Sequence, residues 1–409
     1  MSDQIEVQVD SIAFGGDAVA RHNGMALFIP GGAPGDLLRV QITERNRRYA
    51  RASIVDVVQA GNARVTPPCP VYPLCGGCQW QHIDYADQFQ AKVDIVARAL
   101  QRFEPRTVHH WPAPATSGYR RRARLHWSNR DGLTIGFRER QSERLVNANT
   151  CLQLQPALDA CLPRLRALLQ HSGRTTGNAE LLCNHQGEIH LGLRVDPGDD
   201  ARVIAALNAL QDPWWSGVRL TGGTTSLIIG ASALVLDARG LMASATAFTQ
   251  ANPAQDAVLR DCVSRLVSSV AAKRVLEFHA GIGNFTLDIA RAGVEVEAVE
   301  ANQEAVNLLR SNCTGLNVHA TVANAEQHEW LRKPDCVLLD PPREGAAALM
   351  ARLVAKRVPH IIYVSCDPMT LTRDLAELVK SRYRLHEVNI IDMMPHTYHI
   401  ETVCFLSRH

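Results

Sequence analysis

The feature that most constrains this chain is the regular alternation of apolar strands and helical runs after residue 246. Short apolar segments (RVLEFHA, VEVEAVEA, CVLLDPP, HIIYVSC and RLHEVNIIDM) are separated by helical runs such as residues 256–270. Parallel strands need a crossover connection, which a helix between each pair of strands supplies. The sequence therefore predicts an α/β fold with a doubly wound, Rossmann-like sheet, where ligands bind at the carboxyl ends of the strands.

Two further regions are expected ahead of this one, because 409 residues are too many for one ordinary core. Residues 1–60 alternate short strands with Gly and Pro turns, which predicts a small OB-like β-barrel. Residues 61–245 are expected to form a central α+β domain, and residues 246–409 the C-terminal domain. An amphipathic helix at 87–103 is expected to pack on the C-terminal domain. Arginines 45, 47, 48 and 51 suit an oligonucleotide-binding surface or a solvated hairpin edge.

The chain lacks the marks of secreted and membrane proteins. The start MSDQIEVQVDS has no basic-then-apolar signal segment, and no stretch reaches about 18 uncharged apolar residues. We therefore expect a cytoplasmic protein with no membrane partner. Its 11 cysteines are then expected to be metal ligands or catalysts more often than disulfides.

A glycine-containing turn follows the first strand of the α/β region. Residues 277–285 (EFHAGIGNF) place two glycines between a strand and a helix, where a ligand can approach the backbone. The next strand ends at Glu300, whose carboxylate is positioned to accept hydrogen bonds from ribose hydroxyls. A nicotinamide cofactor is disfavoured, because Thr286 stands where the fuller Gly-x-Gly-x-x-Gly fingerprint has its third glycine. The alternative is a tight turn followed by a surface glutamate.

Three more positions near strand ends carry reactive side chains. Asp340 follows the apolar run CVLL and precedes two prolines, and Cys366 follows HIIYV. A thiolate at this cysteine would be helped by Arg373 or by a neighbouring helix start. Glu401, in the run HTYHIE, is a candidate general base. The structural alternatives are a strand-ending turn, an inert core cysteine and a solvated glutamate.

A cysteine and a base together fit the methylation of uracil at carbon 5. That carbon is a poor nucleophile, but addition of a thiolate to carbon 6 turns the ring into an enolate whose carbon 5 takes a methyl group. The proton on carbon 5 must then leave before the cysteine is expelled, which requires a base. Methyltransferases that act on nucleobases also often carry an acid-Pro-Pro segment such as residues 340–342.

A separate group of cysteines indicates a metal site. Cys69, Cys75 and Cys78 lie close together around two glycines, and Cys151 is the candidate fourth ligand. Zinc remains an alternative, since Cys-x2-Cys is also half of a zinc knuckle. An iron–sulfur cluster held by four thiolates fits better, because the second Cys-x2-Cys of a zinc ribbon is missing. The distance of these cysteines from the α/β region predicts a structural or RNA-positioning role.

Residues 119–127 (YRRRARLHW) combine dense arginines with aromatic side chains. Such a run can pair with phosphates and stack on unpaired bases, as RNA recognition requires. A solvated charged strand is the alternative.

Together these motifs resemble the RNA uridine-5 methyltransferase family, in particular its iron–sulfur branch that modifies 23S ribosomal RNA. The resemblance covers nearly the whole chain. It rests on residues 28–36, which look like a TRAM domain, on 365–374 (SCDPMTLTRD) and on 396–401 (HTYHIE). It implies S-adenosyl-L-methionine as methyl donor, Cys366 as nucleophile, Glu401 as base and a [4Fe–4S] cluster on the four cysteines. The donor ligands that it implies are Gln250, His279, Asn284, Glu300, Asn324 and Asp340.

The resemblance also bears on the partner. The tRNA-modifying branch usually lacks both the TRAM segment and the cluster, so 23S rRNA is expected ahead of tRNA, with the protein a monomer. His279 and Ala280 depart from the family pattern of an aromatic residue and a cysteine, although an imidazole can still contact the donor. DNA cytosine-5 methylation is disfavoured, because Ser365 and not a proline precedes Cys366. An RNA-binding protein with a decayed donor site is the alternative from another class.

Overall fold

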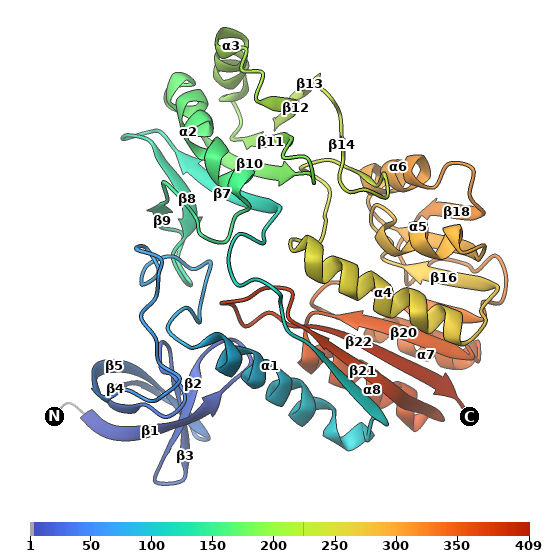
Figure 1. Cartoon of the computed structure of the whole chain (residues 1–409), viewed down its shortest axis with the longest axis horizontal. Helices are drawn as coiled ribbons and strands as arrows, with labels where there is room; N and C mark the ends of the chain where they lie inside the picture. Colours follow the sequence, from blue (N-terminus) through green and yellow to red (C-terminus); the bar gives the residue numbers. More distant parts are fainter. Residues whose placement is uncertain (1–3, 224) are drawn as a thin grey trace.

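The structure, a computed structural model, describes residues 4–223 and 225–409. It has three parts: an N-terminal barrel, a central domain and a C-terminal α/β domain (Figure 1). Within these residues, no helix combines the length and the apolar character that crossing a bilayer requires.

The N-terminal part is a closed β-barrel, as the strand-and-turn pattern predicts. Side chains alternate between the interior and solvent, so that Val7, Val9 and Ile12 of the first strand are buried. The buried carboxylate of Asp36 accepts hydrogen bonds from Arg64 and from the Ala33 amide, which closes one end of the barrel. Its strands, in barrel order, are β1 (Gln4–Ile12), β2 (Ala18–His22), β3 (Met25–Ile29), β5 (Tyr49–Gln59) and β4 (Leu37–Arg45).

The central domain is a seven-stranded sheet with two helices against one face. Alternate residues of its middle strands, such as Leu125, Leu181 and Leu191, pack against the leucines of these helices. The sheet order is β13 (Thr225–Gly230), β12 (Trp215–Gly222), β11 (Ile189–Val195), β10 (Thr176–Cys183), β7 (Arg122–Ser128), β8 (Thr134–Arg138) and β9 (Leu145–Asn147). The helices are α2 (Pro156–His171) and α3 (Asp200–Leu210), and a small pair, β14 (Leu234–Val235) with β15 (Met242–Ala243), leads to the next domain.

The C-terminal domain is built on an eight-stranded sheet. Its order is β18 (Val318–Val322), β17 (Glu295–Glu300), β16 (Arg274–Phe278), β19 (Cys336–Leu339), β20 (His360–Ser365), β22 (Glu401–Arg408), β21 (Tyr383–Ile391) and β6 (Thr107–Trp111). The covering helices are α4 (Pro253–Ser269), α5 (Asn284–Arg291), α6 (Gln303–Asn312), α7 (Ala347–Ala355) and α8 (Pro368–Lys380). The five strands β16 to β20 pair in parallel, as predicted.

The last strand departs from the all-parallel prediction, because β22 runs antiparallel to β20. An antiparallel strand begins at the edge where its neighbour ends, and Ser365 pairs with Thr402. The start of β22 is thereby brought back to the carboxyl edge of the sheet.

Two elements ahead of the central sheet lie against this domain. The strand β6 pairs in parallel with β21, and the helix α1 (Tyr85–Leu100) packs against α8. In Figure 1 both pass beneath the red strands of the C-terminal domain, with α1 between that domain and the barrel. The domain boundaries at residues 61 and 246 stay a prediction. Segments from both sides of residue 246 contribute strands to this sheet, since β6 precedes that residue and the other seven strands follow it.

Candidate active site

The predicted nucleophile and base lie opposite each other at the carboxyl edge of the sheet. Cys366 directly follows β20 and Glu401 opens β22, one position beyond the pair formed by Ser365 and Thr402. The apolar strand HIIYV is buried, so it carries Cys366 to the edge of the core while the cysteine itself stays partly accessible. The pairing of β20 with β22 therefore juxtaposes two residues 35 positions apart in the sequence.

Burial raises the pKa of both reactive groups of the site. Burial raises the pKa of the Cys366 thiol to about 12, and the carboxyl groups of Glu401 and Asp340 add to this effect. Burial also raises the pKa of Glu401 well above its usual value, again with a contribution from Asp340. Since burial disfavours a charged form, the surroundings of both groups favour the neutral thiol and the neutral carboxyl over their ionised forms.

Arg343 is the cation of this site. Its charge opposes the rise in pKa of both Cys366 and Glu401, and its Nη2 atom lies 2.9 Å from Nδ1 of His399. The sequence offered Arg373 for this role, and that expectation is wrong. The Arg373 guanidinium is bound to the Asp374 carboxylate and to the Glu344 carbonyl. A helix start does lie next to Cys366, because α8 begins at Pro368, and its effect on the thiolate stays a prediction.

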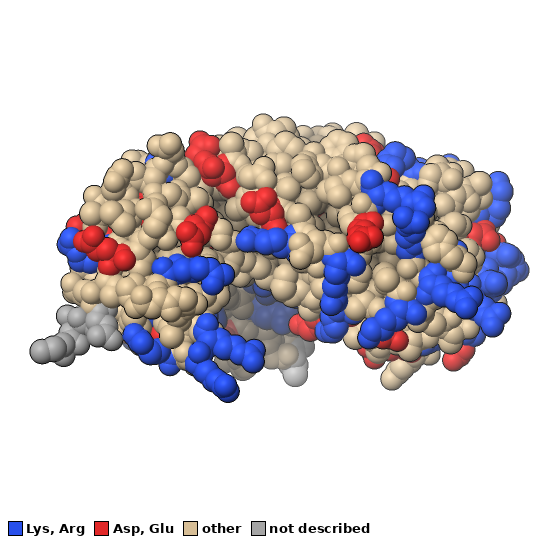
Figure 2. Space-filling model, turned by 90° about the horizontal axis from the view of Figure 1, so that it is seen from below, with Lys and Arg blue, Asp and Glu red and all other residues tan. Residues whose placement is uncertain are grey.

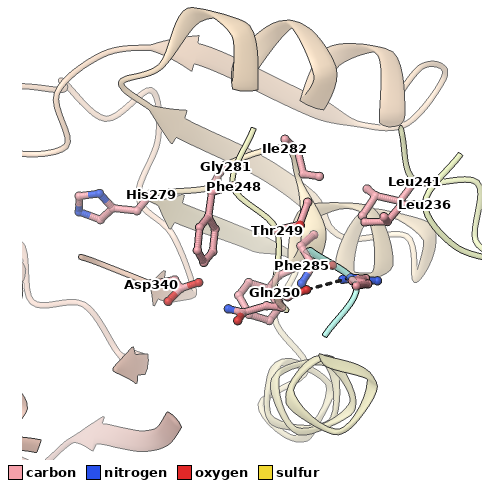
Figure 3. A pocket seen from close by; sticks show the side chains of 13 residues that line it. Leu236, Leu241, Phe248, Thr249, Gln250, His279, Gly281, Ile282, Phe285 and Asp340 are labelled. Carbon is pink, nitrogen blue, oxygen red and sulfur yellow. Dashed lines mark hydrogen bonds between the residues drawn. The ribbon is translucent and has the colours of Figure 1, made fainter. Parts of the chain in front are cut away.

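A pocket beside this pair gathers four of the six predicted donor ligands. Gln250, His279, Asn284 and Asp340 all line it. In Figure 3 the side chains of Phe248, Gln250 and Asp340 lie near the Gly281 turn, while the His279 ring points to the far side. The rest of its wall is mainly apolar or backbone, from Arg121, Leu236, Leu241, Thr249, Ala280, Ile282 and Phe285.

The other two predicted donor ligands lie outside that lining. The Glu300 carboxylate accepts hydrogen bonds from the amides of Gly281 (3.0 Å) and Asn302 (2.8 Å), so it is joined to the glycine turn. Asn324 lies in the loop after β18, where its Oδ1 accepts from the Glu326 amide. At the turn itself Gly281 and Gly283 have positive φ, and so does His279 with φ 61°. The turn thus exposes backbone to a ligand, as the sequence predicts.

Arg121 connects the donor pocket to the central domain. Its Nε donates to the Gln250 carbonyl at 2.8 Å, and its Nη2 lies 3.1 Å from the Asp256 carboxylate. Asp256 in turn accepts from Nδ2 of the Asn284 side chain at 2.7 Å. The expectation that the arginine run faces RNA is wrong for Arg121, which is 4% exposed. The run itself, without its partners, contained no signal for this internal role.

The four predicted metal-binding cysteines line one pocket. Cys69, Cys75, Cys78 and Cys151 come together although Cys151 lies far along the chain. The intervening loop is held to the β8–β9 hairpin, where Gly76 approaches so closely that an added Cβ would lie 2.8 Å from the Arg138 carbonyl. Burial raises the pKa of Cys78 to about 12. Among the described residues, no three His, Cys, Asp or Glu side chains converge tightly enough to hold a single metal ion.

Comparisons with known proteins address the whole chain. A family model described as tRNA (Uracil-5-)-methyltransferase matches residues 331–409, and a TRAM domain model matches residues 3–55. The 23S rRNA (uracil(1939)-C(5))-methyltransferase RlmD of Halomonas elongata is 33% identical over 98% of this chain and 89% of its own length. The RlmD of Salmonella typhi is 34% identical, with 99% and 96% covered.

The chain belongs to the RNA uracil-C5 methyltransferase family. Members transfer a methyl group from S-adenosyl-L-methionine to carbon 5 of uracil in RNA. The family assignment and the TRAM barrel, both expected from the sequence, are confirmed.

The fold of the family is also confirmed. A Pyrococcus abyssi tRNA (uracil-54, C5)-methyltransferase, solved with S-adenosyl-L-homocysteine, superposes with a TM-score of 0.78 at 24% identity, covering 98% of this chain and 100% of that chain. At this identity the match bears on fold alone. The iron–sulfur cluster and the roles of individual residues are not tested by these comparisons.

Proposed function

We propose that this chain methylates carbon 5 of a uridine in 23S ribosomal RNA, with Cys366 as nucleophile and Glu401 as base. The observation that carries the proposal is the position of these two residues, opposite each other where β20 ends and β22 begins. Asp340, which lines the donor pocket, and Arg343 both lie in the loop after β19 and act electrostatically on Cys366 and Glu401.

The reaction follows from these positions. Cys366 first loses its thiol proton, and the resulting thiolate adds to carbon 6 of the uracil ring, which pushes the electron pair of the double bond between carbons 5 and 6 into the ring and makes carbon 5 nucleophilic. The methyl group then passes from the donor sulfur to carbon 5. Glu401 removes the proton from carbon 5, the double bond between carbons 5 and 6 re-forms, and Cys366 leaves as thiolate. The target base is flipped out of its stack for this chemistry, because the ring carbons are inaccessible in a helix.

The donor contributes more than the methyl group. Gln250, His279, Asn284 and Asp340 would hold it in the pocket, with Glu300 beside the glycine turn and Asn324 on the next loop. S-adenosyl-L-methionine carries a positive sulfonium, and a nearby positive charge lowers the pKa of acids. Donor binding would therefore ease deprotonation of Cys366 and Glu401, which burial opposes in the free protein.

A second cavity offers a place for the RNA beside the catalytic strand. It has a volume of about 430 Å³ and is lined by residues from the barrel, the cysteine loop and the central sheet, with Tyr398 from the catalytic side. Its basic and aromatic lining suits phosphates and stacked bases. These lining residues include Arg124, His126, Phe137, Arg138 and Arg140.

Exposed basic side chains extend this surface. In the barrel, Arg45, Arg47 and Arg48 are exposed at the turn between β4 and β5. Figure 2 shows Lys and Arg side chains gathered over the C-terminal domain at the right and, in smaller number, toward the barrel at the left. Such charge favours a polyanionic partner.

The choice of 23S rRNA over tRNA rests on the relatives. Those that match along nearly all of this chain include several named as 23S rRNA methyltransferases. A tRNA substrate is the second candidate, favoured by the description of the family model that matches residues 331–409, tRNA (Uracil-5-)-methyltransferase. We further propose that the protein acts as a monomer, since one chain supplies the whole proposed site. We also propose that it is cytoplasmic, with no membrane partner.

The cysteine pocket suits a [4Fe–4S] cluster. Four thiols spread around one pocket match the ligands of a cluster of several atoms better than those of a single zinc ion, which needs them to converge. Arg120 lines the same pocket, and its buried Nε has no hydrogen-bond partner among the residues that the structure describes, so it can face the negative charge of four thiolates. Bound there, the cluster would tie the cysteine loop to the central domain through Cys151.

The decisive test uses RNA that contains 5-fluorouridine, because fluorine on carbon 5 blocks the proton-abstraction step and leaves the adduct in place. Wild-type protein with donor should form an RNA–protein adduct that survives a denaturing gel, and Cys366→Ala should form none. Cys262→Ala, which alters a buried cysteine of α4 away from the site, is the matched control and should form the adduct. An adduct with Cys366→Ala would overturn the assignment. Calorimetry measures donor binding separately. If the donor gives no heat of binding, the alternative of an RNA-binding protein with a decayed donor site is favoured.

A further inference from the structure

The chain between β21 and β22 is held by hydrogen bonds from other parts of the protein to five successive carbonyls. This connection, residues 392–400, is called the strap below; it ends at Glu401. Each of its first five carbonyl oxygens accepts a hydrogen bond from another part of the protein. Asp392 accepts from Gln255 (3.0 Å), Met393 from Asn252 (3.3 Å), Met394 from Lys92 (3.0 Å), Pro395 from Tyr119 (3.0 Å), and His396 from the amides of Gln79 (2.9 Å) and Trp80 (3.0 Å).

These donors come from three places. Asn252 and Gln255 stand at the start of α4, a few residues after the donor-pocket residue Gln250. Lys92 belongs to α1, and the remaining donors are sequence neighbours of residues that line the cysteine pocket. Gln79 and Trp80 directly follow Cys78, and Tyr119 directly precedes Arg120, which lines that pocket. The strap is therefore fixed jointly by the donor side and the cysteine side of the protein.

Gln88 reinforces the cysteine side. Its side chain is fully buried, and its Oε1 accepts from the His396 amide at 2.8 Å. Its Nε2 lies 3.0 Å from His396 Nδ1 and donates to the Trp80 carbonyl at 3.0 Å. A single amide group thus bridges the cysteine loop and the strap.

The conformation that these bonds hold is specific. His396 has φ 64°, a left-handed conformation that a non-glycine residue adopts at a cost. Thr397 closes the turn, because its hydroxyl donates to the Met394 carbonyl at 2.8 Å. Tyr398, His399 and Glu401 follow at once, so the path of the turn fixes where the base meets the substrate.

We propose that Tyr119 and Gln88 are positioning residues for the base, which hold the strap so that Glu401 reaches the proton on carbon 5. The inference rests on the proposed function and assigns its earlier and later chemical steps to different parts of the protein. Addition of Cys366 to carbon 6 and methyl transfer depend on β20 and the donor pocket. The later step, in which the bond from carbon 5 to hydrogen breaks, Glu401 takes the proton and Cys366 is expelled, depends on the strap.

The test separates these steps with two conservative variants. Tyr119→Phe removes only the hydroxyl that donates to Pro395. Tyr383→Phe is the matched control, because Tyr383 is similarly buried and its hydroxyl donates to the Val358 carbonyl at 2.7 Å, remote from the strap. Each variant is mixed with donor and unmodified RNA. The amount of methylated RNA–protein adduct and the yield of 5-methyluridine are followed over time, with Glu401→Gln as the reference for a blocked proton abstraction.

Tyr119→Phe is expected to accumulate methylated adduct and to lower turnover by about tenfold, since small misplacements of a catalytic group cost this much or more. Donor affinity and the initial rate of adduct formation should stay at wild-type values, as they should in Tyr383→Phe, which should not accumulate adduct. If Tyr119→Phe behaves like Tyr383→Phe while Glu401→Gln traps the adduct, the positioning role is refuted and the proposed function stands. If adduct formation slows instead, the strap serves the earlier step and the inference is also refuted. If wild-type protein makes neither adduct nor product, the proposed function fails and the inference falls with it.

Discussion

Lys92 offers the sharpest prediction about stability. Its ammonium lies 2.7 Å from the Asp392 carboxylate, and both side chains are fully buried. The pair joins α1 to the first residue of the strap, and the ammonium also lies 5.6 Å from the centre of the Trp80 ring. Replacing Lys92 with methionine keeps much of the volume but leaves a buried carboxylate without its cation.

The cost follows from this burial. Removal of one partner of a buried pair destabilises a protein by about 3–5 kcal/mol. For a unit of roughly 150–250 residues this corresponds to a fall in melting temperature of about 6–20 °C. Thermal unfolding followed by circular dichroism at one pH and salt concentration measures it. The double variant Lys92→Met with Asp392→Asn removes both charges and should recover most of the loss.

Lys380→Met is the control, because Lys380 is an exposed lysine on the last turn of α8. It should change stability by no more than about 0.5 kcal/mol. The reasoning is refuted if Lys92→Met unfolds within 2 °C of wild type, or if the double variant is less stable than Lys92→Met alone.

Three further predictions concern the donor, pH and the cysteines. Arg121→Gln should weaken donor binding about tenfold or more in calorimetry, because it removes a charge-assisted contact that orients the pocket wall. Burial raises the pKa of both Cys366, the nucleophile, and Glu401, the base, and both act in their deprotonated forms, so kcat should rise from pH 6 to pH 9; a kcat that falls over this range would contradict these roles. Cys75→Ser should lose bound iron and visible absorbance after anaerobic purification, whereas Cys161→Ala, in the core of the central domain, should keep both; equal iron in the two variants would rule out the cluster.

The parts of the fold that the sequence predicts are those set by local pattern. Buried parallel strands require nearly continuous apolar runs, so the runs HIIYV and CVLL predict two such strands. The residue after each run then falls at the ligand edge, which is how Cys366 and Asp340 were found. The sequence does not predict the antiparallel direction of β22, because a single strand after a loop carries no signal for parallel or antiparallel pairing.

Long-range partners explain the other misses. The carboxylate that pairs with Arg121 is 135 positions away, and nothing near the arginine run marks it. The same run of charge is compatible with RNA contact and with an internal ion pair until the fold is known. Likewise Arg343 was visible in the acid-Pro-Pro segment, but its place beside His399 depends on a contact across 56 positions.

Methylation of 23S rRNA at carbon 5 of a uridine can be tested by incubating anaerobically purified protein with tritiated methyl donor and unmodified 23S rRNA or tRNA transcripts. The RNA is then digested to nucleosides, and label is sought in 5-methyluridine. If the proposed function is right, label will appear in 23S rRNA, at a single uridine, and none will appear in tRNA. Label in tRNA alone would keep the chemistry and contradict the choice of substrate. No label in either RNA, with the four cysteines occupied, would contradict the claim that the chain is an active methyltransferase.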